Sequence, residues 1–273
     1  MLKVPNKDTR LCMSLAARPG NFGTRFHNYL YDRLGLNFLY KAFTTTDLPA
    51  AIGGVRALGI RGCAVSMPFK EACIELVDAM DPSAAAIASV NTLVNDNGRL
   101  TAYNTDYLAI GHLIRHHRLD PGLRVALRGS GGMGKAVACA FRDAGFGNVT
   151  LIARNAEAGP ALAEACGFSW QAEPEGVQAQ LLVNVTPLGM AGGPEAQALA
   201  FPGPMVAAAE AVFDVVALPP RTPLIELAES LGKPVITGLE VVALQALEQF
   251  VLYTGVRPAP ELVEEAVTFA AQG

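Results

Sequence analysis

Short apolar runs alternate with longer amphipathic segments through the first hundred residues. Three runs have the length of strands, LCMSL (11–15), FLYKAF (38–43) and GCAVS (62–66), and between them apolar residues recur every three or four positions, as on the buried face of a helix. This order predicts a β-α-β-α-β arrangement. Farther on, Asp96, Asn97 and Gly98 separate two alternating runs and predict the turn of a β-hairpin.

A second series of strands and helices follows the chain break DPG (120–122), which comes after a helix predicted from Asp106 to about Arg118. The predicted strands are RVALRG, NVTLIAR, LLVNVT, VFDVV and PVIT, with helical segments between them. Strands and helices that alternate in this way form a parallel sheet with helices on both faces. The segment LEVVALQALEQFVLYTG predicts a helix that stops at Gly255 and returns to the first domain. The fold class is therefore α/β with two domains.

Composition and charge narrow the kinds of partner. The formal net charge is -4, whereas a nucleic acid would require a basic face, so no nucleic acid is expected as a partner. No apolar stretch resembles a signal peptide or a membrane span, which predicts a cytoplasmic protein with no membrane partner. The five cysteines lack CxxC spacing and the four histidines lack HExxH, so we expect reduced buried thiols and no metal.

A glycine cluster lies between a predicted strand and a predicted helix, in VALRGSGGMGKAVACAF (125–141). Gly129, Gly131 and Gly134 fit the spacing GxGxxG, which lets backbone amides and a helix N-terminus receive a pyrophosphate. The next strand ends at Arg154 and Asn155, where an NAD-binding protein would place an acidic residue for the ribose 2′-hydroxyl. An arginine suits a 2′-phosphate, so NADP(H) is favoured over NAD(H). The alternatives are a tight turn without a ligand and a solvated charge at the strand end.

Lys70 follows Pro68 in SMPFKEA, where a helix is predicted to begin. A cation near a helix N-terminus is opposed by the helix dipole, which lowers the pKa of a lysine and suits proton transfer. The alternative is that Glu71 neutralises the charge. A second polar cluster, Asn91, Thr92, Asn104, Thr105 and Asp106, lies at the ends of the hairpin strands, where Asp106 is also a plausible helix cap.

Six motifs in one order resemble the shikimate dehydrogenase family: MPFK (67–70), VNT (90–92), YNTD (103–106), GSGG (129–132), NVTPLGM (184–190) and TGLEVVALQA (237–246). The resemblance implies reversible reduction of 3-dehydroshikimate to shikimate by hydride transfer from NADPH, as part of aromatic amino acid biosynthesis. It also implies a substrate-binding domain, residues 1–106 plus 239–273, and an NADP-binding Rossmann domain, residues 107–238. The substrate would be a polyhydroxylated cyclohexene carboxylate.

The resemblance also implies roles for individual residues. Lys70 and Asp106 would form the catalytic pair, and Asn91, Gln245 and Ser66 would bind the substrate. A hydride that reaches a ketone carbon creates negative charge on oxygen, which a nearby ammonium stabilises and protonates. The implied cofactor contacts are Gly129, Gly131, Gly132, Gly134, Arg154, Asn155, Thr186 and Gly238.

Three stretches depart from the family pattern. In FDVVALPPRTPL, Ala217 stands where the family commonly has a tyrosine in the substrate pocket. In NFGTRFHN, Asn21 and Gly23 replace the two serines that hold the substrate carboxylate, so Asn21, Thr24 or Arg25 would take over that contact. In ARNAEA the position of a second phosphate-binding arginine holds an alanine, Ala158.

The loss of that arginine predicts weaker NADPH binding and some tolerance of NAD(H), unless Arg128 compensates. These departures are those of a shikimate dehydrogenase-like side branch. The alternative functions are oxidation of quinate or of aminoshikimate, and dinucleotide sensing without turnover.

Overall fold

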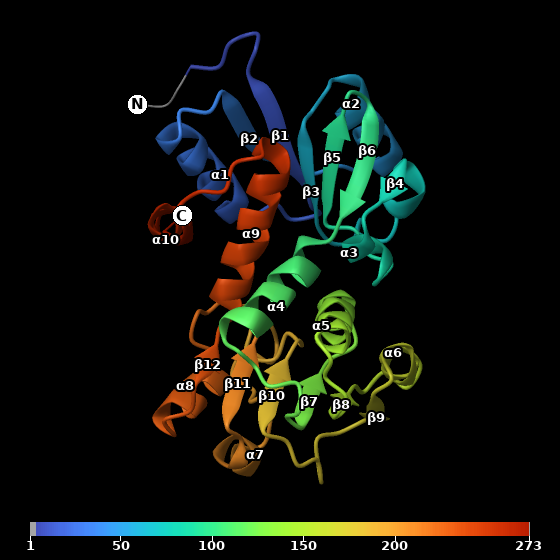
Figure 1. Cartoon of the computed structure of the whole chain (residues 1–273), viewed down its shortest axis with the longest axis vertical. Coiled ribbons are helices and arrows are strands. Elements are labelled where there is room, and N and C mark those ends of the chain that lie inside the picture. The colour runs from blue at the N-terminus through green and yellow to red at the C-terminus, as the bar shows by residue number, and fades with distance from the viewer. Residues whose placement is uncertain (1–3, 273) are drawn as a thin grey trace. The chain divides into compact units, whose positions relative to one another are not determined.

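The computed structural model describes residues 4–272 and divides the chain into two compact units. Unit 1 contains the chain up to Thr105 together with the segment from Gln245 onward, and unit 2 is the continuous segment Asp106–Leu244. Each unit has its own sheet (Figure 1). Both sheets carry parallel strands joined by helices, so the predicted α/β class with two domains is confirmed.

Unit 1 is built on a mixed sheet in the order β2-β1-β3-β5-β6-β4. Strands β1, β2 and β3 are parallel, as the predicted β-α-β-α-β order requires, while β5 runs antiparallel to β3 and β6. The elements are β1 (Arg10–Leu15), α1 (Phe22–Arg33), β2 (Phe38–Phe43), α2 (Leu48–Ala57), β3 (Gly62–Val65), the 3-10 helix η1 (Ile74–Leu76), β4 (Ala79–Met80), α3 (Pro82–Ala85), β5 (Thr92–Asp96), β6 (Arg99–Tyr103) and, near the C-terminus, α10 (Pro260–Ala271).

The predicted hairpin turn is present between β5 and β6. Asn97 and Gly98 have φ values of 55° and 90°, the left-handed pair that a two-residue turn of this kind requires. The side chain of Asn95 supports the turn, because its Oδ1 accepts a hydrogen bond from Gly98 N at 2.8 Å and its Nδ2 donates to Val55 O at 2.9 Å. The turn is thus fixed against α2.

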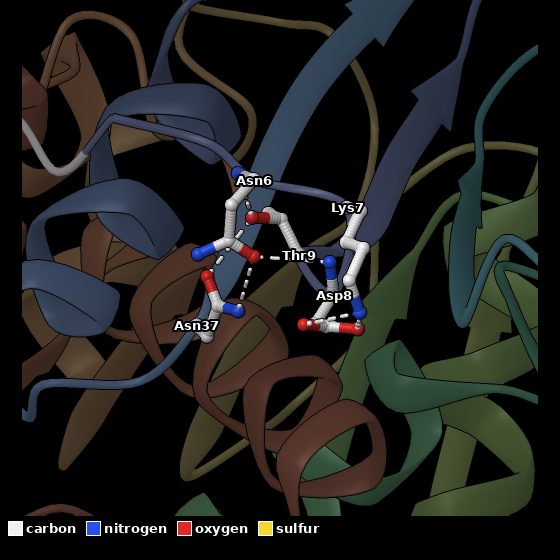
Figure 2. A network of polar contacts seen from close by, with 5 residues as sticks. All are labelled: Asn6, Lys7, Asp8, Thr9 and Asn37. Carbon is white, nitrogen blue, oxygen red and sulfur yellow. Dashed lines mark hydrogen bonds and ion pairs between the residues drawn. The ribbon is translucent and has the colours of Figure 1, made fainter.

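A polar network aligns the first two strands (Figure 2). Thr9 Oγ1 accepts from Asn6 N at 2.8 Å and donates to Asn37 Oδ1 at 2.9 Å, while Asn37 Nδ2 donates to Asn6 Oδ1 at 3.3 Å. The backbone N–H of Arg10 also donates to Asn37 O at 3.0 Å. These bonds hold the residues before β1 and β2 together and set the register in which Arg10 pairs with Phe38.

The C-terminal segment completes unit 1. Helix α9 (Gly238–Thr254) passes from unit 2 into unit 1, as the predicted return to the first domain requires. Tyr253 near its end is fully buried and packs so closely on Gly62 that a Cβ there would lie 2.2 Å from the ring. Arg61 Nε donates to Tyr253 O at 3.0 Å. Helix α10, which follows, packs on α1 and was not predicted.

Unit 2 is built on a parallel sheet in the order β12-β11-β10-β7-β8-β9. All four residues of β10 are buried, and since alternate side chains point to opposite faces, both faces of the sheet are covered there. The elements are α4 (Thr105–His116), β7 (Val125–Arg128), α5 (Gly132–Asp143), β8 (Val149–Ile152), α6 (Ala158–Cys166), β9 (Ser169–Gln171), β10 (Leu181–Asn184), α7 (Gly203–Ala208), β11 (Ala211–Asp214), α8 (Pro223–Ser230) and β12 (Val235–Ile236).

The five cysteines are buried free thiols, as predicted. Two of them, Cys139 in α5 and Cys166 at the end of α6, lie with their sulfur atoms 3.9 Å apart. None of the helices within residues 4–272 is both long enough and apolar enough to cross a membrane.

Candidate active site

The MPFK stretch forms a turn instead of the predicted start of a helix. After β3, Phe69 N donates to Ser66 O at 2.9 Å, and the chain continues through turns to η1. The prediction of a helix that begins after Pro68 is therefore wrong, and so is the inference that a helix dipole acts on Lys70. The backbone carbonyl of Lys70, which is half-buried, accepts from Val90 N at 3.1 Å. This bond brings MPFK beside VNT.

Asn91 has a side-chain amide with a fixed orientation. Its Oδ1 accepts hydrogen bonds from Thr92 Oγ1 at 2.8 Å, from Thr105 N at 2.8 Å and from Thr105 Oγ1 at 3.2 Å. Asn91 is 2% exposed, and within residues 4–272 its Nδ2 has no hydrogen-bond partner. A buried donor without a partner costs about 1–3 kcal/mol, so this N–H group is suited to a ligand oxygen.

Gln249 supports this arrangement and was not predicted. Its Nε2 donates to Thr92 Oγ1 at 3.0 Å and to Asn91 O at 3.4 Å. It lies one helical turn after the predicted substrate residue Gln245, which is half-buried on the same helix, α9. The spacing of four residues was the one signal in the sequence that could have identified it.

The YNTD stretch carries the chain from unit 1 into unit 2. Asn104 is buried, its Nδ2 donates to Ser89 O at 2.9 Å, and its backbone N–H donates to Ser83 Oγ at 3.1 Å. Asp106 is the second residue of α4 and is 7% exposed. Because Thr105 N is hydrogen bonded to Asn91, the chain begins α4 directly beside the Asn91 amide.

The residues expected to hold a carboxylate lie at the start of α1. Asn21 is exposed at the N-cap position and makes no capping bond with its side chain, whereas the Oγ1 of Thr24 is buried without a hydrogen-bond partner in the described part of the chain. Arg25 is held elsewhere: its Nε and Nη2 donate to Phe269 O at 3.1 and 2.8 Å. The position of Arg25 therefore does not support the carboxylate contact suggested for it.

His27, farther along α1, lies in the core of unit 1. It is fully buried and stacks on Tyr40 with the ring centres 4.4 Å apart. Burial lowers the pKa of His27 to about 3, and the Gln249 amide opposes this shift only in part. The imidazole is thus a neutral core group at physiological pH.

The glycine loop in unit 2 has two kinds of glycine. Gly129 has a φ of 123°, and a Cβ on Gly134 would lie 2.6 Å from Gly129 O, so both positions exclude a side chain for reasons of backbone geometry. Nothing lies within 4 Å of a Cβ built on Gly131 or Gly132. The first pair lets α5 approach β7, and the second leaves the backbone at the helix N-terminus accessible to an anion.

A cavity of about 270 Å³ adjoins this loop. It brings together four of the predicted cofactor residues, Gly129, Arg154, Asn155 and Thr186, with Arg128 beside them. The full lining is Arg128, Gly129, Ser130, Ile152, Ala153, Arg154, Asn155, Ala172, Thr186 and Leu188. The cavity lies beyond the carboxyl ends of β7 and β8, where open parallel sheets bind ligands.

Several predicted cofactor residues use their polar atoms internally. Asn155 Oδ1 accepts from Glu157 N at 3.0 Å and from Ala158 N at 2.9 Å, which fixes the turn that leads into α6. Thr186 Oγ1 donates to Asn184 Oδ1 at 2.6 Å. Gly238 does not line the cavity, and a Cβ there would lie 2.3 Å from the carbonyl carbon of Val216. Among residues 4–272 no group of three or more His, Cys, Asp or Glu side chains could hold a metal ion.

Comparison with known proteins gives consistent matches. The model of the shikimate dehydrogenase substrate binding domain matches residues 22–93. A shikimate dehydrogenase-like protein of Haemophilus influenzae is 57% identical, with 97% of this chain and 98% of the relative covered. A shikimate dehydrogenase (NADP(+)) of Moorella thermoacetica is 36% identical, with coverages of 90% and 88%.

Solved structures agree with these relatives. The crystal structure of shikimate 5-dehydrogenase from Thermus thermophilus, in complex with NADP(H) and shikimate, superposes with a TM-score of 0.85 at 31% identity and covers 96% of this chain and 99% of that chain. The resemblance found in the six sequence motifs is thereby confirmed. The chain belongs to the shikimate dehydrogenase family of oxidoreductases.

Proposed function

We propose that this protein is an NADP-dependent dehydrogenase that interconverts 3-dehydroshikimate and shikimate. The observation that carries this proposal is the Asn91 amide, whose Oδ1 accepts three hydrogen bonds while its buried Nδ2 has no partner within residues 4–272. An amide oriented in this way presents its NH2 group as a donor to a substrate hydroxyl. The relative from Moorella thermoacetica is a shikimate dehydrogenase (NADP(+)), and the enzyme from Thermus thermophilus was solved with NADP(H) and shikimate.

The cofactor residues fit a dinucleotide. Gly131 and Gly132 leave backbone N–H groups uncovered at the start of α5, and Arg128 and Arg154 line the adjoining cavity, so a pyrophosphate and a 2′-phosphate would each meet positive charge. Asn155 and Thr186 would shape the walls of this cavity. When bound, the nicotinamide supplies the hydride, and the protein supplies position and a proton.

Lys70 would act as the proton donor for ketone reduction. As the hydride adds to the carbonyl carbon, the C=O double bond opens and the oxygen gains negative charge, which the Lys70 ammonium stabilises before it transfers a proton to that oxygen. In the reverse direction the neutral amine accepts the hydroxyl proton. The bond from Val90 N to Lys70 O fixes the lysine backbone beside the segment that carries Asn91.

The remaining residues would bind and orient the substrate. Asp106 would accept a hydrogen bond from a ring hydroxyl, and Asn91 and Gln245 would contact the other hydroxyls. Ser66, Asn21 and Thr24 would contact the carboxylate end, where the buried Thr24 hydroxyl is a hydrogen-bonding group without a partner in the described chain. Several weak contacts of this kind hold the ketone carbon in one position.

A substrate screen tests the proposal. Purified protein is mixed with shikimate or quinate and with NADP+ or NAD+, and reduced nicotinamide is measured by absorbance. Turnover of shikimate with NADP+ supports the proposal, and turnover of quinate alone would assign the protein to quinate oxidation. Cofactor binding without any reduction would favour a dinucleotide-sensing protein.

The Lys70→Ala variant tests the mechanism. It should lower kcat by about a hundredfold or more, as expected for loss of a general acid, while NADPH binding stays nearly unchanged. Lys7→Ala is the matched control, because Lys7 is exposed and pairs only with its neighbour Asp8 among the contacts described. Full activity of Lys70→Ala would remove the lysine from the mechanism.

A further inference from the structure

Two arginines line the cavity beside the glycine loop, and their side chains differ in exposure. The Arg128 side chain is 17% exposed, and its Nη1 donates to Ala200 O, so the guanidinium is tethered. The Arg154 side chain is 69% exposed. Two cations that line one small cavity repel each other, and an anion placed between them would relieve this repulsion.

Carboxylates already face both arginines. Glu195 Oε2 lies 3.9 Å from Arg154 Nη2, and Glu173 Oε2 lies 3.8 Å from Arg128 Nη2. Both glutamates are about half exposed, with 44% and 54% of their side-chain surface accessible. At these distances and exposures the pairs are weak, worth at most about 1 kcal/mol each. An arriving anion could therefore replace either carboxylate.

Charges of both signs act on the Arg128 guanidinium. Burial and the neighbouring Arg154 lower the pKa of Arg128, whereas Glu173, Glu175 and Glu195 raise it. Three carboxylates are thus within electrostatic reach of a cavity that holds two guanidinium groups. A dianionic 2′-phosphate would be attracted by the arginines and repelled by the glutamates. A 2′-hydroxyl carries no charge, so both interactions would be much weaker for it.

We propose that Glu173 and Glu195 compete with the 2′-phosphate of NADP(H) for Arg128 and Arg154, and that this competition sets how strongly the protein selects NADP(H) over NAD(H). The inference rests on the proposed function in one respect, that a nicotinamide dinucleotide occupies this cavity. Arg128 then serves as the second phosphate-binding cation that Ala158 cannot provide. The glutamates are selectivity residues and take no part in hydride transfer.

Calorimetric titration with NADPH and with NADH tests this directly. Glu195→Gln and Glu173→Gln should each lower the Kd of NADPH by about two- to fivefold, and the double variant by about the product, while the Kd of NADH changes by less than about twofold. High salt should reduce the difference between the cofactors. Glu164→Gln, on the exposed face of α6, is the control for the change in net charge.

An independent signal comes from the single tryptophan of the chain. Trp170 Nε1 donates to Ala153 O at 3.1 Å, and Ala153 lines the cavity, so Trp170 fluorescence should report occupancy. Arg128→Gln should weaken NADPH more than NADH, and if this variant fails to fold without its bond to Ala200, the glutamate variants still decide the question. An equal change for both cofactors, or no change, would overturn the inference.

The outcomes also separate this inference from the proposed function. If the unmodified protein binds both dinucleotides but reduces neither with shikimate, the dehydrogenase assignment fails and the selectivity argument stands on the binding data alone. If it binds neither dinucleotide, both are overturned.

Discussion

The Nε2 group of Gln249 donates a hydrogen bond to Thr92 Oγ1 at 3.0 Å, and the Thr92 hydroxyl in turn donates to Asn91 Oδ1 at 2.8 Å. Gln249, in the last third of the chain, therefore sets the orientation of the Asn91 amide, in the first third. Since an amide has one acceptor and one donor end, this chain of bonds decides which end of Asn91 is left for a substrate.

Replacement of Gln249 by Leu should loosen the Asn91 amide without removing a group that touches the substrate. We expect KM for shikimate to rise by about two- to tenfold, the range for one lost hydrogen bond, with a smaller effect on kcat. Steady-state kinetics measure the split. Glu248→Gln is the control, because Glu248 is adjacent on α9 but its side chain pairs with Arg257. A fall in kcat with KM unchanged would contradict the positioning role.

Gly134 should be intolerant of a side chain. A Cβ would lie 2.6 Å from Gly129 O, which is backbone and cannot move aside, so Gly134→Ala should displace the loop from α5. NADPH binding should weaken by about tenfold, equivalent to about 1.4 kcal/mol. In contrast, Gly132→Ala meets nothing within 4 Å and should not lower the free energy of unfolding, although it can still hinder the cofactor. Equal destabilisation of both variants in urea would argue against this distinction.

His27 should make the stability of the protein depend on pH. Burial lowers its pKa to about 3 from 6.5, so below about pH 6.5 the unfolded chain binds a proton that the folded protein does not. The free energy of unfolding should fall by up to about 1.4 kcal/mol per pH unit from this residue as pH decreases toward about 3. His27→Phe should flatten this slope in urea unfolding, whereas the same change at the exposed His116 should not.

Thr222 should be essential to the packing of unit 2. Its hydroxyl donates to the fully buried Asp214 Oδ2 at 2.6 Å and accepts from Ile225 N at 3.2 Å, which caps α8. Thr222→Val loses both bonds and should lower the free energy of unfolding by about 2–4 kcal/mol. Thr222→Ser keeps the hydroxyl and should recover most of that loss. If Ser is as destabilising as Val, the methyl group that Ser lacks and Val keeps would contribute as much as the hydroxyl, which would contradict this account.

Local patterns predicted the features that depend on nearby residues. Asn97 and Gly98 predicted the hairpin because both can adopt positive φ, and the glycine spacing after Val125 predicted the loop that precedes α5. The parallel sheet followed from the alternation of strands and helices. In each case the determining residues lie within a few positions of one another.

Features set by distant contacts could not be predicted in this way. Arg25 contacts Phe269 O, 244 residues farther along the chain, and no local pattern contains that information. The turn at Lys70 was predicted as a helix because proline commonly opens helices, whereas the chain there closes through Phe69 N to Ser66 O. Strands β4 and β9 are too short to show a periodicity.

The interrupted course of unit 1 has a consequence for its synthesis. Unit 2 is one continuous stretch of chain, but Gly62 in unit 1 lacks its packing partner until Tyr253 has been translated. The core of unit 1 therefore cannot be completed by the residues up to Thr105 alone. A stop codon placed before the codon for Tyr253 should therefore destabilise unit 1, although most of that unit precedes it in the chain.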